Sequence, residues 1–161
     1  MSSDGVTRVL FVCLGNICRS PTAEAVFTST VQARGLGSDI EIDSCGTSGW
    51  HRGEPPDERA TREAARRGHD MTALRGRQIE LQDFERFHYI LAMDHANLAE
   101  LQRMCPAAFR GHLGLFLEFA PGVDEEEVPD PYYGEDAGFS HVLDLVEAAS
   151  EGLLNALQRR D

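Results

Sequence analysis

The stretch Val9–Thr22, which reads VLFVCLGNICRSPT, constrains the fold more than any other part of the sequence. Its apolar beginning, Val9–Val12, predicts a buried strand. Ser20 and Pro21 then predict a helix start, because a serine can cap the first turn and a proline lacks only an N–H that this turn leaves unbonded. A tight loop that begins at Cys13 therefore joins a strand to a helix N-terminus. Backbone N–H groups and the helix dipole favour an anion at such a junction.

The spacing Cys-x5-Arg-Ser in this loop brings three kinds of group to one tetrahedral phosphate. We expect a thiolate at Cys13 below the phosphorus, because a helix N-terminus stabilises the ionised sulfur. Arg19 can hold two equatorial oxygens with its planar guanidinium, and the Ser20 hydroxyl can hydrogen-bond the thiolate. Gly15 and Asn16 tolerate the left-handed backbone that a closed loop requires. The N–H groups expected around the phosphate oxygens belong to Leu14, Gly15, Asn16, Ile17, Cys18 and Arg19.

A cysteine alone at a strand end is usually a buried packing residue, but the register of Arg19 and Ser20 favours the phosphate site. The letters C-L-G-N-I-C-R-S-P closely resemble the active-site signature of the low-molecular-weight protein tyrosine phosphatases. The resemblance implies a bacterial-type enzyme that hydrolyses protein phosphotyrosine and aryl phosphates through a phosphocysteine intermediate on Cys13. It extends over nearly the whole chain, through D-S-C-G-T-S-G-W at 43–50, P-P-D-E-R at 55–59, A-M-D at 92–94 and D-P-Y-Y-G at 130–134.

Phosphoryl transfer to a thiolate still requires a proton for the departing oxygen. Asp130 lies between two prolines on a stiff loop, and general acids need a fixed geometry. An aspartate before proline is by itself usually a turn residue; the resemblance implies that Asp130 is the general acid and then the general base. Aromatic side chains are expected to wall a deep cleft that suits a phenyl phosphate, although Trp50 could also be an ordinary half-buried tryptophan. These expected wall residues are Trp50, Tyr132 and Tyr133.

The chain departs from the family pattern at Leu74, which replaces the histidine of S-x-H-x-A-R. The resemblance implies a hydrogen-bond network that includes Asn16 and Ser44 and holds the phosphate loop. Leucine has no donor or acceptor, so we expect Asn16 to hold its turn through Ser44 or water alone. The alternative is that the Thr72 hydroxyl or an arginine from Arg75–Arg77 has replaced the histidine.

Two further residues have two interpretations each. Asp94 either orients Arg19 or caps the following helix, and we favour the cap. Cys18 either packs in the loop or traps an oxidised Cys13 as a disulfide.

Alternating strands and helices predict an α/β fold. We expect a single domain over residues 1–161, with a four-stranded parallel sheet, helices on both faces and the phosphate-binding loop after the first strand. Ligands bind such sheets at the carboxyl ends of the strands. Strands are expected at 9–12, 40–44, 89–93 and 112–119, and helices at 21–33, 58–67, 81–87, 96–104 and 139–158.

Composition and charge limit the partners of this 161-residue chain. A formal net charge of -12 argues against nucleic acid, whose binders carry a basic patch. No apolar run approaches the length of a membrane span, and no signal peptide is visible at the N-terminus. We therefore expect a cytoplasmic monomer, with export by a signal-less route left open. The histidines and cysteines lack the spacing of a metal site, so no metal or organic cofactor is expected.

The resemblance implies phosphotyrosine-containing proteins as partners, with a tyrosine kinase among the candidates. An arsenate reductase of the same fold is the alternative, because arsenate resembles phosphate. That chemistry needs a relay of further cysteines, and the segment Leu74–Met93 contains none. A phosphate-binding module without turnover is a third interpretation, against which Cys13, Arg19 and Asp130 argue together.

The sequence generates a first prediction at Cys13. Replacing Cys13 with serine is expected to abolish turnover of an aryl phosphate, because a serine hydroxyl does not supply a thiolate at neutral pH. The variant is expected to retain phosphate binding, since the backbone N–H groups and Arg19 remain. Steady-state kinetics and phosphate titration measure the two properties separately. Activity within tenfold of wild type would mean that Cys13 is not the nucleophile.

Overall fold

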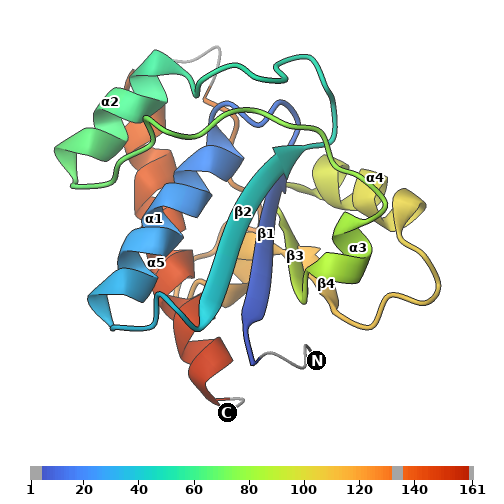
Figure 1. Cartoon of the computed structure of the whole chain (residues 1–161). Helices are drawn as coiled ribbons and strands as arrows, with labels where there is room; N and C mark the ends of the chain where they lie inside the picture. The colour runs from blue at the N-terminus through green and yellow to red at the C-terminus, as the bar shows by residue number, and fades with distance from the viewer. Residues whose placement is uncertain (1–4, 132–135, 160–161) are drawn as a thin grey trace.

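Four parallel strands form the centre of the computed structural model, which describes residues 5–131 and 136–159. The strands are β1 (Thr7–Cys13), β2 (Ile40–Gly46), β3 (Tyr89–Ala92) and β4 (His112–Leu115), in the spatial order β2-β1-β3-β4. Each neighbouring pair is parallel, which requires a crossover connection between them. The predicted α/β fold with a four-stranded parallel sheet is confirmed (Figure 1).

Helices cover both faces of this sheet (Figure 1). The helices α1 (Arg19–Ala33), α2 (Glu58–Arg66) and α5 (Asp136–Arg159) pack together on one face, and α3 (Asp83–Arg86) and α4 (His95–Met104) lie on the other.

The central strand β1 is buried on both sides. Val9 and Phe11 belong to the larger core with α1 and α5, while Leu10 and Val12 belong to the smaller core with Phe84. A run that is apolar at every position is expected for a parallel strand covered by helices on both faces. The end of β1 is therefore held on two sides, which fixes the position of Cys13.

The helix α1 begins two residues earlier than the predicted Pro21. Arg19 is its first residue and Cys18 its N-cap, with no side-chain capping bond. The expected cap by Ser20 is wrong, because the Ser20 hydroxyl lies against the Cys13 sulfur instead. The predicted cap Asp94 before α4 is confirmed by a bond from a backbone N–H group, and Asp57 caps α2 in the same way.

The predicted strand over 112–119 is half wrong. β4 ends at Leu115, and a 3₁₀ helix, η1 (Phe116–Phe119), follows it. β3 supplies only four partner residues, so the ladder has no continuation beyond Leu115. Phe116 and Leu117 are both buried, which breaks the in-out alternation of a strand and suits a turn of helix.

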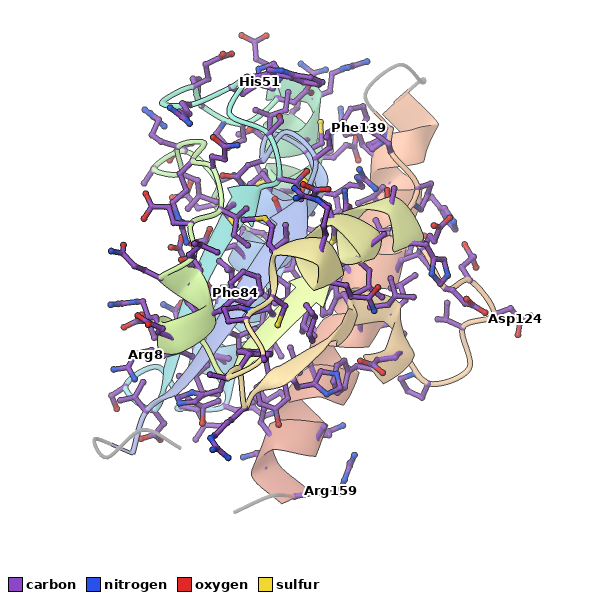
Figure 2. All side chains as sticks on the ribbon, turned by 90° about the vertical axis from the view of Figure 1, so that its right-hand side faces the viewer. Arg8, His51, Phe84, Asp124, Phe139 and Arg159 are labelled. Carbon is purple, nitrogen blue, oxygen red and sulfur yellow. The ribbon has the colours of Figure 1, made fainter. Side chains whose placement is uncertain are left out.

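The loops at the carboxyl ends of β1, β2 and β3 gather at one end of the molecule. Figure 2 shows His51 at this end and Arg8, near the start of β1, toward the opposite end. Among the described residues, no helix combines the length and apolar character needed to span a bilayer.

Candidate active site

The loop 14–18 lies between β1 and α1 and is tied to its surroundings by its carbonyl groups. The Ser48 N–H donates to the Leu14 oxygen at 3.0 Å, and the Asp57 N–H donates to the Ile17 oxygen at 2.8 Å. In residues 5–131 and 136–159, the N–H groups of Gly15, Ile17 and Cys18 make no hydrogen bond to the protein. The loop therefore directs its acceptors to the protein and keeps donors available for an anion.

Cys13 ends β1 at the floor of this loop and is only 3% exposed. Its Sγ lies 3.0 Å from the Ser20 Oγ, and the Asn16 N–H donates to it at 3.2 Å. The predicted contact between Ser20 and the Cys13 sulfur is present in the structure.

Asn16 holds the turn of the loop with a left-handed backbone, at φ 58°. Its Nδ2 donates to the hydroxyls of Ser20 at 2.8 Å and Ser44 at 3.1 Å. The left-handed conformation predicted for Asn16 is confirmed, but Gly15 does not share it. A Cβ at Gly15 would lie 3.0 Å from the His51 ring, so a larger residue there would require that ring to shift by a few tenths of an ångström.

The expectation that Asn16 is held by Ser44 or water alone is wrong. The backbone N–H of Arg77 donates to the Asn16 Oδ1 at 3.0 Å, so the group that holds it comes from the segment Arg75–Arg77 but is not a side chain. Leu74 packs against the larger hydrophobic core.

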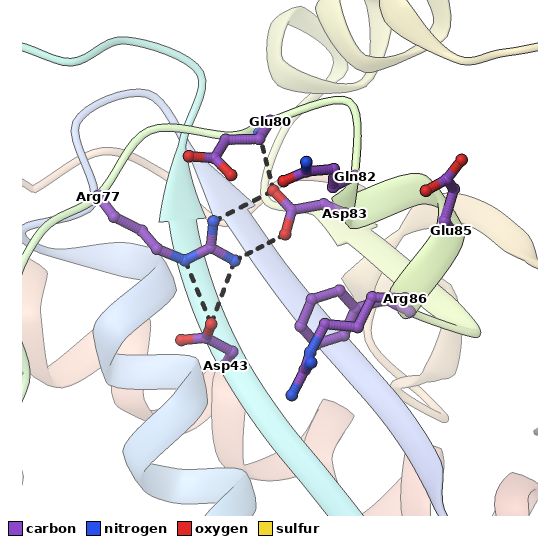
Figure 3. A pocket seen from close by; sticks show the side chains of 8 residues that line it. Asp43, Arg77, Glu80, Gln82, Asp83, Glu85 and Arg86 are labelled. Carbon is purple, nitrogen blue, oxygen red and sulfur yellow. Dashed lines mark hydrogen bonds and ion pairs between the residues drawn. The ribbon is translucent and has the colours of Figure 1, made fainter.

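The side chain of Arg77 anchors the segment that supplies this N–H group. Its guanidinium bonds Asp83 at 3.0 and 3.1 Å and Asp43 at 3.2 Å (Figure 3). These residues line an open depression of about 540 Å³, in which Arg77 and Arg86 are both bonded to carboxylates. The depression therefore offers little uncompensated positive charge to a ligand, and we assign no site to it.

Arg19 is buried beside the loop, at 3% exposure. Its Nη1 donates to the Asp94 Oδ2 at 2.7 Å and to the Val128 carbonyl at 3.1 Å. Its Nη2 lies 3.8 Å from the Asp130 Oδ2. Burial by itself would lower the pKa of this guanidinium, but the negative charges of Cys13, Asp94 and Asp130 outweigh burial and raise it. Arg19 is therefore a permanent cation in the site.

Asp94 performs both tasks between which the sequence left a choice. One carboxylate oxygen accepts the Asn97 N–H at 2.7 Å and caps α4, and the other accepts from Arg19. The preference for the cap alone was incomplete. A carboxylate has enough acceptor sites for both bonds.

A cleft of about 100 Å³ opens above Cys13. Trp50 is 74% exposed, so it is a rim residue and not an ordinary half-buried tryptophan. Asp130 also lines the cleft, with 45% of its side chain exposed. The expected walls Tyr132 and Tyr133 lie outside the described residues. The lining is Cys13, Leu14, Gly15, Ile17, Cys18, Arg19, Trp50, His51 and Asp130.

Cys18 shares the cleft with Cys13 but differs from it chemically. Burial raises the pKa of the Cys18 thiol, and the nearby charges of Asp57 and Cys13 raise it further. Cys18 is therefore a neutral thiol at physiological pH, which leaves Cys13 as the candidate nucleophile. Within the described residues, no cluster of histidine, cysteine and carboxylate side chains suits a metal ion.

The sequence analysis missed three groups that take part in the site: the Glu24 carboxylate, the Val128 carbonyl and the Arg77 N–H. The Ser44 hydroxyl donates to the Glu24 Oε1 at 2.6 Å, and a glutamate inside a helix ordinarily suggests a solvated face. The Val128 carbonyl and the Arg77 N–H are backbone groups, which no residue type announces. His51 also lines the cleft and was not predicted. Its place next to Trp50 in the sequence is the one signal that could have added it to the expected wall residues.

Comparison with known proteins gives consistent matches. The sequence model of a family described as low molecular weight phosphotyrosine protein phosphatase matches residues 8–161. A low molecular weight phosphotyrosine protein phosphatase of Schizosaccharomyces pombe is 48% identical over 152 residues, covering 93% of this chain and 96% of the yeast protein. A crystal structure of a protein tyrosine phosphatase from Entamoeba histolytica has a TM-score of 0.92 at 39% identity, covering 95% of this chain and 97% of that one. A Drosophila arginine phosphatase has a TM-score of 0.88 at 34% identity, covering 95% and 99%.

The double role of Asp94 generates a second prediction. The Asp94→Ser variant keeps a capping oxygen for α4 but loses the carboxylate that holds Arg19. We expect unfolding stability within about 1 kcal/mol of wild type, and a 10- to 100-fold loss in kcat/KM for an aryl phosphate, on the order of one hydrogen bond to a charged group. Urea unfolding and steady-state kinetics measure the two effects.

The matched control for this prediction is Asp57→Ser, the same substitution at the cap of α2. It is expected to change stability by a similar amount with a smaller loss in kcat/KM. Equal kinetic losses in the two variants would mean that Asp94 acts through the cap alone.

Proposed function

Because the chain belongs to the low molecular weight phosphotyrosine protein phosphatase family, we propose that it hydrolyses protein phosphotyrosine through a phosphocysteine intermediate. Its enzyme class is that of the family, protein-tyrosine-phosphatase. The observation that carries the proposed mechanism is the convergence of Cys13, Arg19 and Asp130 on one cleft whose floor presents unbonded N–H groups. These groups supply a nucleophile, a phosphate-binding cation and an acid.

In the first step, the Cys13 thiolate attacks phosphorus from the floor of the cleft. A sulfur–phosphorus bond forms and the bond from phosphorus to the tyrosyl oxygen breaks. Asp130 donates its proton to the departing oxygen, and Arg19 holds the equatorial oxygens with the backbone N–H groups of the loop. Asp130 lines the same cleft as Cys13, which supports this assignment.

In the second step, water attacks the phosphorus of the phosphocysteine. Asp130, now a carboxylate, accepts a proton from the water, and the sulfur–phosphorus bond breaks to release phosphate. The departing sulfur regains a negative charge, which the hydrogen bonds from Ser20 and Asn16 stabilise. The same two donors therefore serve sulfur as nucleophile and as leaving group.

The lining of the cleft supports an aromatic phosphate ester as substrate. Leu14 and Ile17 of the loop and Trp50 at the rim present apolar surface in the cleft, and a phenyl ring gains by stacking and burial there. A phosphoarginine, the phosphoramidate that the name of the arginine phosphatase relative suggests, would place a polar guanidino group against the same surface with less favourable desolvation. We therefore assign tyrosine and not arginine phosphate.

The arsenate reductase alternative has less support. A disulfide relay needs a series of accessible thiols beyond Cys13, and of the other cysteines only Cys18 lines the cleft. Cys45 is fully buried, and burial raises the pKa of its thiol well above the ordinary value. The relatives named above are phosphatases. We propose phosphotyrosine-containing proteins as substrates and a monomeric cytoplasmic enzyme.

The test of the proposed mechanism is the Asp130→Ala variant on a series of aryl phosphates. The loss of kcat is expected to be largest, about 100-fold or more, for leaving groups as basic as tyrosine, because general acids contribute ~10²–10⁴-fold. Activated phenols need no proton, so their loss is expected to be small. The matched control is Asp124→Ala, which removes another exposed aspartate a few residues before Asp130 in the sequence. A uniform loss across the series would remove Asp130 from the role of acid.

Trp50 generates a prediction on specificity. The Trp50→Ala variant is expected to lose about tenfold in kcat/KM on phosphotyrosine peptides, the value of one aromatic contact, while phosphoserine peptides change little. The rim position predicts unchanged unfolding stability, since the side chain is mostly exposed. Paired peptide assays and urea unfolding measure both properties. An equal loss on the two peptides would show that Trp50 does not contact the substrate ring.

A further inference from the structure

Glu24 is a partly buried carboxylate that the proposed mechanism does not use. It lies on α1, one helical turn after Ser20, so both side chains project toward the same side of the helix. Its Oε1 accepts the Ser44 hydroxyl proton at 2.6 Å. Ser44 in turn contacts Asn16, which makes Glu24 the outer end of the network that holds the phosphate loop.

The donors in this network have a fixed direction. Ser44 has one hydroxyl proton and gives it to Glu24, so its lone pairs are left to accept the Asn16 Nδ2–H at 3.1 Å. The second Nδ2–H of Asn16 goes to the Ser20 Oγ at 2.8 Å. Ser20 must then direct its own proton away from Asn16, toward the Cys13 sulfur at 3.0 Å or the Cys45 carbonyl at 3.3 Å.

Protonation of Glu24 would disturb this order. A carboxylate can only accept, whereas a carboxylic acid can also donate to Ser44. If it does, the Ser44 proton needs another acceptor, and Asn16 presents an N–H donor, not an acceptor, on its side. The side chain of Leu74, which stands where the family has a histidine, has neither a donor nor an acceptor to replace the lost bond.

We propose that Glu24 is a positioning residue for the phosphate loop: its carboxylate orders the hydrogen bonds from Ser44 through Asn16 to Ser20, and protonation releases this order. The inference deepens the proposed function, because it makes the geometry of the loop around Cys13 depend on a group outside the cleft. The carboxylate touches neither sulfur nor phosphate. Its action passes through two neutral side chains.

The surroundings of Glu24 make this release accessible near neutral pH. Burial raises the pKa of its carboxyl to about 7, against the lowering effect of the bond from Ser44. Among the described residues, the charges that act on it are Asp43 on β2, which raises the pKa, and Arg77 before α3, which lowers it. Arg77 is bonded to Asp43 (Figure 3), so the two partly cancel. The carboxyl is therefore ionised above about pH 7 and neutral below it.

The experiment uses sulfate as the probe, because it binds a phosphate loop and remains a dianion between pH 6 and 8. The Glu24→Gln variant keeps an acceptor for Ser44 but does not titrate, and Glu24→Met removes the acceptor. For each protein, the sulfate dissociation constant at pH 6 is divided by the constant at pH 8. This ratio is expected to be two- to tenfold larger for wild type than for Glu24→Gln, the value of about one hydrogen bond. Glu24→Met is expected to bind weakly at both pH values.

The sign of the effect separates positioning from simple charge. If Glu24 acted only as a negative charge, its ionisation would repel sulfate, and wild type would bind more weakly at pH 8. That result, or the same pH dependence in wild type and Glu24→Gln, would overturn the proposal. The exposed Glu85→Gln variant on α3 is the matched control and is expected to follow wild type.

A second readout follows the network itself. The side-chain amide resonance of Asn16 is expected to shift in the NMR spectrum of wild type with a midpoint near pH 7, and to lose this midpoint in Glu24→Gln. An unchanged midpoint in the variant would assign the titration to another group and overturn the proposal. Neither readout requires turnover, so both remain decisive if the Asp130→Ala test rejects the proposed mechanism.

Stability provides an independent check on the ionisation. The folded protein binds the Glu24 proton more tightly than the unfolded chain, whose carboxyl has a pKa near 4.5. This contribution to stability is therefore present at low pH and falls as pH rises from about 4.5 to 7. Glu24→Gln removes it, so the stability of the variant relative to wild type is expected to rise over this interval. A constant difference would show that Glu24 does not titrate there and would overturn the proposal.

Discussion

The left-handed backbone of Asn16 is the constraint on which the rest of the site depends. A non-glycine residue at φ 58° is disfavoured by roughly 1–2 kcal/mol, so its neighbours must hold it there. Three hydrogen bonds of its side chain do so: its Nδ2 donates to the Ser20 and Ser44 hydroxyls, and its Oδ1 accepts the Arg77 N–H. The turn brings the Asn16 N–H to the Cys13 sulfur. An asparagine suits this position because its amide has donors for two hydroxyls and an acceptor for an N–H.

The support for Asn16 comes from three separate parts of the fold. Ser20 belongs to α1, Ser44 to β2, and Arg77 to the segment before α3. Because β1 is buried between two helical layers, the position of the loop relative to these parts varies little. The geometry of the phosphate loop is thus a property of the whole sheet and not of the contiguous motif. A substitution that leaves a cavity in either core would therefore be expected to shift the loop through these contacts.

The sequence predicted the contiguous parts of this arrangement better than the assembled ones. The strand, the loop and the contact of Ser20 with Cys13 follow from residues within one short stretch, where spacing alone fixes the chemistry. The predicted start of α1 was wrong because the Ser20 hydroxyl could either cap the helix or contact the Cys13 sulfur. In the structure it contacts the sulfur, and the helix begins at Arg19. The missing histidine led to an expectation of a weaker network. The backbone N–H of Arg77 donates to the Asn16 Oδ1 instead. A sequence does not indicate such a bond, because every residue except proline has a backbone N–H.

Arg19 shows why the cation of the loop is an arginine. Both protons of its Nη1 are used by the protein, one on Asp94 and one on the Val128 carbonyl. Within the described residues, the Nε and Nη2 groups form no hydrogen bond, so three N–H donors remain. Two of these are parallel in the plane of the guanidinium, the arrangement that matches two phosphoryl oxygens. A lysine has three protons on one nitrogen. Two of them would be needed to replace the bonds to Asp94 and Val128, which leaves one donor for the proposed phosphate group and no parallel pair. The same contacts that bury Arg19 and fix its orientation therefore also require a side chain with more donors than an ammonium group offers.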